Sequence, residues 1–284
     1  MKSEKNFRGC LNVSITLKPG VSKWFLLTSD RHHDNAHCNR DLEKKHLDEA
    51  VERDAHIIDI GDFFCAMQGK WDRRADTTQL RPEYIGGNYL DLLVDEATKF
   101  FGPYADRFLQ ISPGNHETSI LKRHETNLTE RLVERLNQKS GDHKIHVGGF
   151  SGWIRFQLAY QSGKNSRAFN FYYHHGYGGG GPVTRGVIQT NRMATYLPDA
   201  HFVYTGHTHD EWLVPIQRAR LSQAGRPYQD TQTHIRTPGY KDEFDDGDGG
   251  WHIERGGPPK PMGACWLRFY FLSKEFRHEV IAAR

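Results

Sequence analysis

Two histidines one residue apart, His207 and His209, follow an apolar run in the segment 201–209, HFVYTGHTH. At the end of an extended strand, residues i and i+2 project to the same side, about 6 to 7 Å apart. Neutral imidazole is a common ligand of metal ions. This separation lets two imidazoles reach two cations about 3.5 to 4 Å apart, the spacing of hydrolytic sites with two metals. The pair therefore predicts a metal centre, if other strand ends supply further ligands.

Four more polar clusters follow short apolar runs: DRH at 30–32, GD at 61–62, GNHE at 114–117 and HHG at 174–176. We predict these runs as strands, and open α/β sheets place their ligands at strand ends. Taken singly, each polar residue could be a turn residue, a cap or a surface histidine. Their occurrence at successive strand ends favours one shared site. The candidate ligands are Asp30, His32, Asp62, Asn115, one of His174 and His175, His207 and His209.

The donor types of these candidates narrow the choice of metal. Carboxylate and amide oxygens combined with imidazoles, and no thiolate, suit Mn²⁺, Fe, Zn²⁺, Ni²⁺ or Mg²⁺. We expect two divalent ions, with Mn²⁺ preferred. Asp62 is the natural bridge, because one carboxylate offers an oxygen to each cation and its charge reduces their mutual repulsion.

The elements that must position these residues alternate between strand and helix in the first half of the chain. Predicted strands occupy 24–27, 56–60 and 107–112, and predicted helices occupy 39–54, 88–101 and 119–138. The second half is mostly strands, at 143–147, 152–160, 167–173, 201–205, 212–221, 228–236, 264–272 and 275–282, with a helix at 184–196. This pattern predicts one α/β domain over 1–284 with two sheets packed between helices. The Gly-, Pro- and Asp-rich segment 241–261 is predicted to be a mobile loop.

Composition limits the class of protein further. The chain has 284 residues, a formal net charge of +3 and four cysteines without a C-x-x-C pair. We expect reduced thiols in a cytoplasmic protein. No signal peptide and no apolar run long enough to span a bilayer is present, so no membrane partner is expected. The mild basicity permits a phosphate-bearing partner without requiring one, and the oligomeric state stays open.

The five blocks, in this order from residue 30 to 209, resemble the calcineurin-like metallophosphoesterases. That resemblance implies a two-sheet β-sandwich flanked by helices, an αββα arrangement, with a dinuclear metal centre at the edge of the sheets. By resemblance, one metal belongs to Asp30, His32, Asp62 and His209, and the other to Asp62, Asn115, His174 and His207. An H-x-G pattern favours His174 in the fourth block, and His175 is the alternate ligand.

The resemblance also implies a reaction. Two cations lower the pKa of a shared water and stabilise negative charge on phosphate oxygens. His116 would protonate the leaving oxygen, and its alternative role is that of a structural loop histidine. Glu117 either orients His116 or begins the next helix, where a carboxylate complements the helix dipole, and we favour the second role.

The second block bears on the substrate. Protein phosphatases of this superfamily usually continue it as GDxxDRG, whose arginine holds phosphate, whereas residues 61–67 here are GDFFCAM. We therefore expect a phosphodiesterase or nuclease acting on nucleic acid or nucleotides. A phosphomonoesterase acting on a small or protein substrate, or a non-catalytic scaffold, is the alternative. Arg31 and His33 are candidate contacts to substrate phosphate, with a solvated surface as their alternative. The basic loop around Lys70, Arg73, Arg74 and Arg81 more often means a charged surface.

Overall fold

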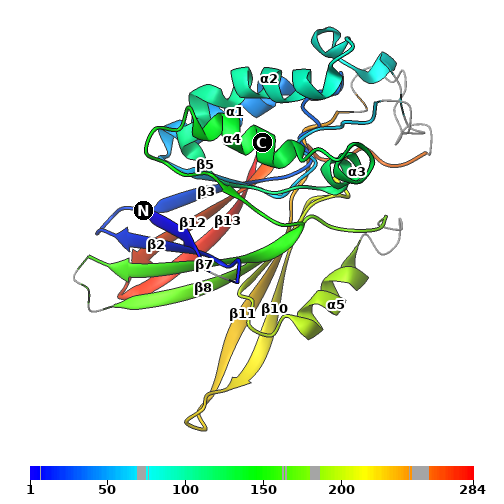
Figure 1. The fold of residues 1–284 in the computed structure, drawn as a ribbon. Helices are drawn as coiled ribbons and strands as arrows, with labels where there is room; N and C mark the ends of the chain where they lie inside the picture. The colour runs from blue at the N-terminus through cyan, green and yellow to red at the C-terminus, as the bar shows by residue number, and fades with distance from the viewer. Residues whose placement is uncertain are drawn as a thin grey trace.

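The structure is a computed structural model of residues 1–284. The residues that the structure describes are 1–6, 8–68, 75, 77–161, 163, 165–179, 186–242, 244 and 256–284. Two β-sheets face each other, and helices cover the outer face of each (Figure 1). The mixed α/β arrangement expected from the sequence is confirmed.

One sheet has six strands in the order β13-β12-β3-β4-β5-β6. Its parallel part consists of β3 (Lys23–Thr28), β4 (His56–Asp59), β5 (Phe108–Ile111) and β6 (His146–Val147). The closing strands β12 (Ala264–Leu272) and β13 (Glu275–Ala283) are antiparallel, and β12 pairs directly with β3. Its outer face carries α1 (Arg40–Glu52), α2 (Tyr89–Phe101), α3 (Asn115–His124) and α4 (Leu128–Asn137). Short 3₁₀ turns lie at Thr77–Gln79, Pro82–Tyr84 and Gly102–Arg107.

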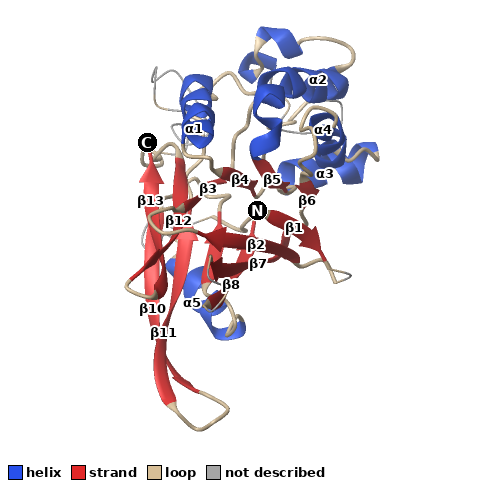
Figure 2. Ribbon diagram, turned by 90° about the vertical axis from the view of Figure 1, so that its left-hand side faces the viewer, coloured by secondary structure: helices blue, strands red, loops and turns tan. Residues whose placement is uncertain are grey.

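The other sheet has seven strands in the order β1-β2-β7-β8-β9-β11-β10. They are β1 (Lys2–Lys5), β2 (Leu11–Leu17), β7 (Ser151–Tyr160), β8 (Ser166–His174), β9 (Phe202–Thr205), β10 (Trp212–Leu221) and β11 (Pro227–Arg236). α5 (Val187–Tyr196) packs on its outer face through Met193, against Val203 of β9. Figure 2 shows the two strand layers with α1 to α4 on one side and α5 on the other.

The core between the sheets follows from strand periodicity. In β3, Phe25 and Leu27 face the second sheet, while Leu26 faces the helices. Aromatic rings fill the space between the layers, with the Phe25 and Phe156 centroids 4.8 Å apart and those of Phe156 and Phe269 5.1 Å apart. Burying these apolar side chains stabilises the sandwich by about 25 cal/mol for each Å² removed from water.

Two features differ from the sequence-based expectation. The single helix predicted at 119–138 is two helices, because Glu125 takes a left-handed φ of 52° and ends α3. Asn127 then caps α4 by accepting a hydrogen bond from the Glu130 N–H at 3.2 Å. The strands β1 and β2 were not predicted.

The expected loop at 241–261 lies largely outside the described residues. Within the described ranges, no helix is long and apolar enough to cross a bilayer.

Candidate metal centre

The predicted ligands lie just beyond the ends of parallel strands in both sheets. β3, β4 and β5 run parallel in one sheet, and β8 and β9 run parallel in the other. The Asp30 carboxylate links the two sheets, because Oδ2 of this residue, which follows β3, accepts the backbone N–H of His207, which follows β9, at 2.8 Å. This hydrogen bond brings the ends of β3 and β9 together, so the ligand-bearing loops meet at one edge of the sandwich.

Asp30, His32 and His209 form a first group that could hold a metal ion. The Nε2 atoms of His32 and His209 are 3.3 Å apart, and His209 Nε2 is 3.4 Å from Asp30 Oδ1. Burial raises the pKa of Asp30, but the hydrogen bond and charge of His209 outweigh it and hold this pKa below its ordinary value. The Asp30 carboxylate is therefore ionised, as a metal ligand must be.

Asp62, His175 and His207 form the second group. His175 Nε2 lies 3.2 Å from Asp62 Oδ2 and 3.1 Å from the side-chain oxygen of Asn115. Its Nδ1–H donates to the Ile60 carbonyl at 3.1 Å, which aims Nε2 at this group. Burial lowers the pKa of His175, but the Asp62 carboxylate outweighs this effect and raises the pKa to about 9. A cation bound here would displace that proton.

The structure corrects the choice between the two adjacent histidines. His174, which the sequence favoured, has an Nδ1 that accepts the Gly176 N–H at 2.9 Å and a ring that packs on Phe150. Tyr173 points into the core between the sheets, so His174, the next residue of β8, points to the opposite face. The chain turns after His174, and this turn brings His175 to the metal-ligand groups.

The spacing and donor types of these atoms fit metal ions. Two ligands, each about 2.1 Å from one cation at tetrahedral or octahedral angles, are about 3.0 to 3.4 Å apart. The four separations given above, 3.1 to 3.4 Å, fall in this range. Asp30 Oδ1 and the Nδ1 atoms of His32 and His207 are buried without a hydrogen-bond partner. Buried polar atoms rarely lack partners, and a cation would satisfy Asp30 Oδ1.

Backbone conformation sets these side chains apart from ordinary turn residues. Non-glycine residues seldom adopt positive φ, and each such residue costs about 1 to 3 kcal/mol unless its surroundings enforce the conformation. The predicted ligands in this region, with φ between 47° and 72°, are Asp30, His32, Asp62, His207 and His209. Strain of this kind is typical of functional sites.

Two glycines let the backbone approach the carboxylates. A Cβ on Gly114 would overlap the Oδ1 atom of Asp62, and a Cβ on Gly206 would overlap Ser29 Oγ and lie 2.6 Å from Asp30 Oδ2. Any larger residue at either position would displace a predicted ligand. These glycines explain why the third and fifth blocks each contain one directly before a ligand.

Glu117 ties the second block to the third. One carboxylate oxygen accepts the N–H groups of Asp62 at 3.1 Å and Gly114 at 2.7 Å, and the other accepts the Phe64 N–H at 2.9 Å. Burial and the charge of Asp62 raise its pKa to about 8, while the N–H donors favour the ionised form. Glu117 does begin α3, as expected, but its hold on the Asp62 loop was not predicted.

Arg236, at the end of β11, is a second residue that the sequence analysis missed. It is only 3% exposed, and its Nη1 donates to Thr208 Oγ1, between the two ligand histidines, at 3.0 Å. Its Nη2 donates to Gln189 of α5 at 3.2 Å, and its guanidinium lies 4.9 Å from the Trp212 ring centroid. Arg236 thus fastens the His207–His209 loop to α5. A lone arginine at a strand end carries no signal that could have identified it.

The proposed substrate contacts Arg31 and His33 point away from the metal-ligand groups. Arg31 is fully buried and pairs with Glu43 at 2.9 Å and Asp59 at 2.7 Å. His33 Nδ1 lies 2.8 Å from the other oxygen of Glu43. Asp30 and His32 belong to the metal-ligand groups, while Arg31 and His33 both contact Glu43 of α1, on the helix side. Their expected contact with substrate phosphate is therefore wrong.

The predicted basic loop is only partly described. Arg81 donates to the Cys38 carbonyl at 2.6 Å and the Asn35 carbonyl at 3.2 Å, so it braces the loop after His33. Lys70, Arg73 and Arg74 lie outside the described residues.

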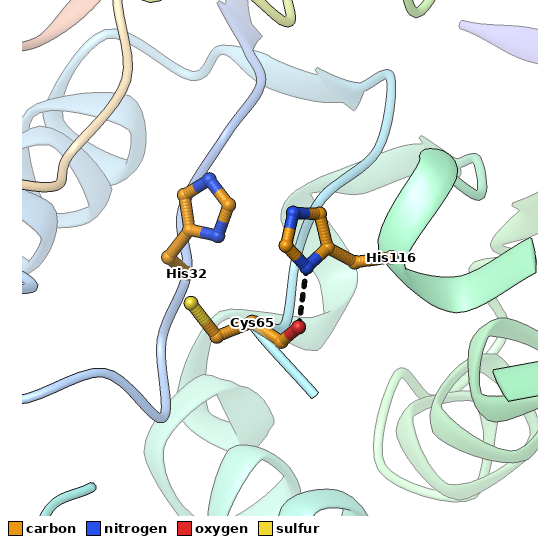
Figure 3. Close-up of side chains that lie close together, drawn as sticks. All are labelled: His32, Cys65 and His116. Carbon is orange, nitrogen blue, oxygen red and sulfur yellow. Dashed lines mark hydrogen bonds between the residues drawn. The ribbon is translucent and has the colours of Figure 1, made fainter. Parts of the chain in front are cut away.

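His116 lies directly beside both groups. Its backbone N–H donates to Asp62 Oδ1 at 3.0 Å, and its Nε2 is 3.6 Å from Asp62 Oδ2. Its Nδ1–H donates to the Cys65 carbonyl (Figure 3). That bond fixes the ring so that Nε2 faces the metal-ligand groups, with the His32 ring centroid 5.0 Å away.

The two adjacent histidines of the fourth block form a matched pair for testing the site. We expect His175→Ala to reduce bound Mn²⁺ from two ions per chain to about one, because Nε2 of His175 faces the second group. His174→Ala should keep both ions. Metal analysis after equilibrium dialysis measures this, and the reverse result would contradict our correction.

A structural role for Arg31 predicts a loss of stability. Arg31→Met leaves Glu43 and Asp59 as buried carboxylates without their cation, so the free energy of unfolding should fall by about 3 to 5 kcal/mol. Lys44→Met, which removes an exposed ion pair with Asp48, should leave it almost unchanged. Urea denaturation followed by circular dichroism measures both changes. Unchanged stability of Arg31→Met would contradict this role.

Comparison with known proteins adds little at the level of sequence. No protein family and no curated protein matches the chain. Among solved structures, a predicted phosphoesterase from Streptococcus pneumoniae is similar at 9% identity and a TM-score of 0.34, covering 93% of this chain and 91% of that one. Vacuolar Protein Sorting 29 from Cryptosporidium parvum is 11% identical, with a TM-score of 0.36 and coverage of 92% and 98%. GAP50, the anchor in the inner membrane complex of Plasmodium, is 10% identical, with a TM-score of 0.43 and coverage of 93% and 85%.

In the order of its five motifs and in the two helix-covered sheets that bear them, the chain resembles the calcineurin-like metallophosphoesterases.

Proposed function

We propose that this protein is a phosphoesterase that uses two divalent metal ions, Mn²⁺ above all, to hydrolyse phosphodiesters of nucleic acid or nucleotides. The observation that carries the proposal is the meeting of two carboxylate–histidine groups at one edge of the sandwich, with His116 beside them. Buried groups of this composition at strand ends are typical of hydrolytic metal centres.

Each metal would have oxygen and nitrogen ligands from several loops. The first would be held by Asp30, His32, His209 and Asp62, and the second by Asp62, Asn115, His175 and His207. Hard oxygens and imidazoles without thiolate favour Mn²⁺ and its neighbours in the first transition row. When bound, the two cations would supply Lewis acidity and a hydroxide nucleophile near neutral pH.

The chain's own contribution is the delivery of a proton to the leaving group. The Cys65 carbonyl accepts the Nδ1–H of His116, so a second proton on this ring sits on Nε2, which faces the ligand groups. From there it can pass to the departing alkoxide oxygen as the P–O bond breaks. The ring is largely shielded from solvent, with its side chain 10% exposed, and this limits proton exchange with bulk water.

The placement of Arg31 supports a diester more than a monoester. A phosphomonoester carries up to two negative charges near neutral pH and gains most from extra cationic side chains. Arg31, the arginine inside the first block, is neutralised by Glu43 and Asp59 and does not face the site. A diester, with one charge, has less need of such a residue.

Hydrolysis of two model esters tests the proposal. With Mn²⁺, the protein should cleave bis(p-nitrophenyl) phosphate with a higher kcat/KM than p-nitrophenyl phosphate, and chelation or Asp62→Asn should abolish both activities. A preference for the monoester would favour a phosphatase. Uptake of two Mn²⁺ without hydrolysis of either ester would favour a non-catalytic scaffold, and no metal uptake would refute the proposal outright.

Proton donation by His116 has its own signature. His116→Ala should lower kcat for a diester with an alkoxide leaving group by about 100- to 10,000-fold, a typical general-acid contribution. The loss should be much smaller for bis(p-nitrophenyl) phosphate, because p-nitrophenolate departs without protonation. His124→Ala, at the far end of the same helix, is the control. Equal losses for both leaving groups, or loss of bound Mn²⁺, would argue against a general acid.

A further inference from the structure

Beside the two predicted metal groups lies a third set of ligand-type side chains: His32, Cys65 and His116. Each offers one ligand atom, and these three atoms lie within 4.8 Å of one another. Figure 3 shows the Cys65 sulfur and the rings of His32 and His116 gathered around a common space. The residues come from three separate blocks, after β3, after β4 and at the start of α3. Their closeness is therefore a product of the fold rather than of sequence spacing.

His32 has a nitrogen that the first group does not use. Its Nε2 faces His209 at 3.3 Å, while its Nδ1 is buried and has no hydrogen-bond partner. A buried polar atom without a partner has lost its hydrogen bonds to water and gained none in return. A ligand near Cys65 and His116 would offset that loss.

Cys65 has a donor character unlike that of the other site residues. Its sulfur accepts a hydrogen bond from the Asn35 amide at 3.2 Å. Burial, and then the nearby Asp34 carboxylate, raise the pKa of the thiol, so it stays protonated without a cation. A hard ion such as Mn²⁺ competes poorly for sulfur, whereas soft thiolate ligands select Zn²⁺ and similar cations.

We propose that His32, Cys65 and His116 form a separate site for a thiophilic divalent cation such as Zn²⁺ or Cd²⁺, whose binding inhibits the Mn²⁺-dependent enzyme. On binding, the Cys65 S–H bond breaks, its proton passes to solvent and an Sγ–metal bond forms. His116 contributes a nitrogen lone pair. His32 contributes Nδ1, whose proton also leaves to solvent when Nε2 already holds the first metal.

The geometry requires only a small adjustment. Ligand atoms around a tetrahedral Zn²⁺ with sulfur and nitrogen ligands are about 3.3 to 3.7 Å apart. The three atoms now lie within 4.8 Å of one another. Side-chain rotations that move each atom by about 1 Å would bring them to the distances that Zn²⁺ requires. The inhibitory effect rests on the proposed function, because a metal on Nε2 of His116 prevents this atom from delivering a proton.

Cd²⁺ provides a test that does not need activity, because a cadmium–thiolate bond absorbs in the near ultraviolet. Titration of the Mn²⁺-loaded protein should produce this charge-transfer band, saturating at one Cd²⁺ per chain. Cys65→Ala should lose the band, and His116→Ala should weaken Cd²⁺ binding at least about tenfold. Cys10→Ala removes a partly exposed thiol away from the site and should keep the band. Circular dichroism verifies that each variant is folded.

Inhibition of hydrolysis by Zn²⁺ is the second test of the proposed site. Each variant's Mn²⁺-dependent hydrolysis is normalised to its own rate, and Zn²⁺ should inhibit Cys65→Ala at least about tenfold less strongly than the wild type. A Cd²⁺ band that survives in Cys65→Ala, or that never appears in the wild type, would overturn the proposal. A normal band in a protein that hydrolyses neither ester would support this site and refute the proposed function instead.

Discussion

Asp30 and Asp62 each divide their two carboxylate oxygens between holding another segment and facing the candidate metal centre. Asp30 accepts the His207 N–H with Oδ2 and leaves Oδ1 near His209. Asp62 accepts the His116 N–H with Oδ1 and presents Oδ2 to His175. The same two side chains therefore position the loops and supply the negative charge. Their placement sets that of the histidines from both sheets, and hence the chemistry that the edge can perform.

The surroundings of these carboxylates keep strained loops in place. Arg31, Glu43 and Asp59 form a buried ion-pair network next to the first block. Glu117 accepts three backbone N–H groups from the second and third blocks. A buried network with satisfied partners gives a local structure that is costly to distort. Five left-handed ligand residues are tolerated because these contacts determine their backbone. Two metal cations would further offset the negative charge gathered there.

The sequence predicted the local parts of this arrangement well. Alternation of side chains predicted that His207 and His209 would reach one metal centre, and both belong to the metal-ligand groups. The same rule could have placed Arg31 and His33 on the opposite side, so a signal for their structural role was present. The choice of His174 rested on the H-x-G pattern, and it failed because the strand ends at His174 and the turn brings His175 to the site.

Long-range partners were beyond the reach of the sequence. Glu117 accepts a hydrogen bond from a loop 55 residues earlier in the chain, and Arg236 donates one to a loop 28 residues earlier. Each pair joins the ends of neighbouring strands within one sheet, β4 and β5 or β9 and β11, and no local pattern encodes that strand order. The missed strand β2 is a different case. Its buried residues Leu11, Val13, Ile15 and Leu17 alternate with polar ones, which is the ordinary pattern of a half-buried strand.

The position of β12 has a consequence for biosynthesis. This strand, formed by residues 264–272, lies against β3, which leads into Asp30. During translation, β3 leaves the ribosome long before β12, its neighbour on this side. Until β12 arrives, that edge of β3 is open to pairing with other nascent chains. The support of Asp30 on this side is complete only once residues 264–272 have been synthesised, and a nonsense mutation before them would leave the edge uncovered.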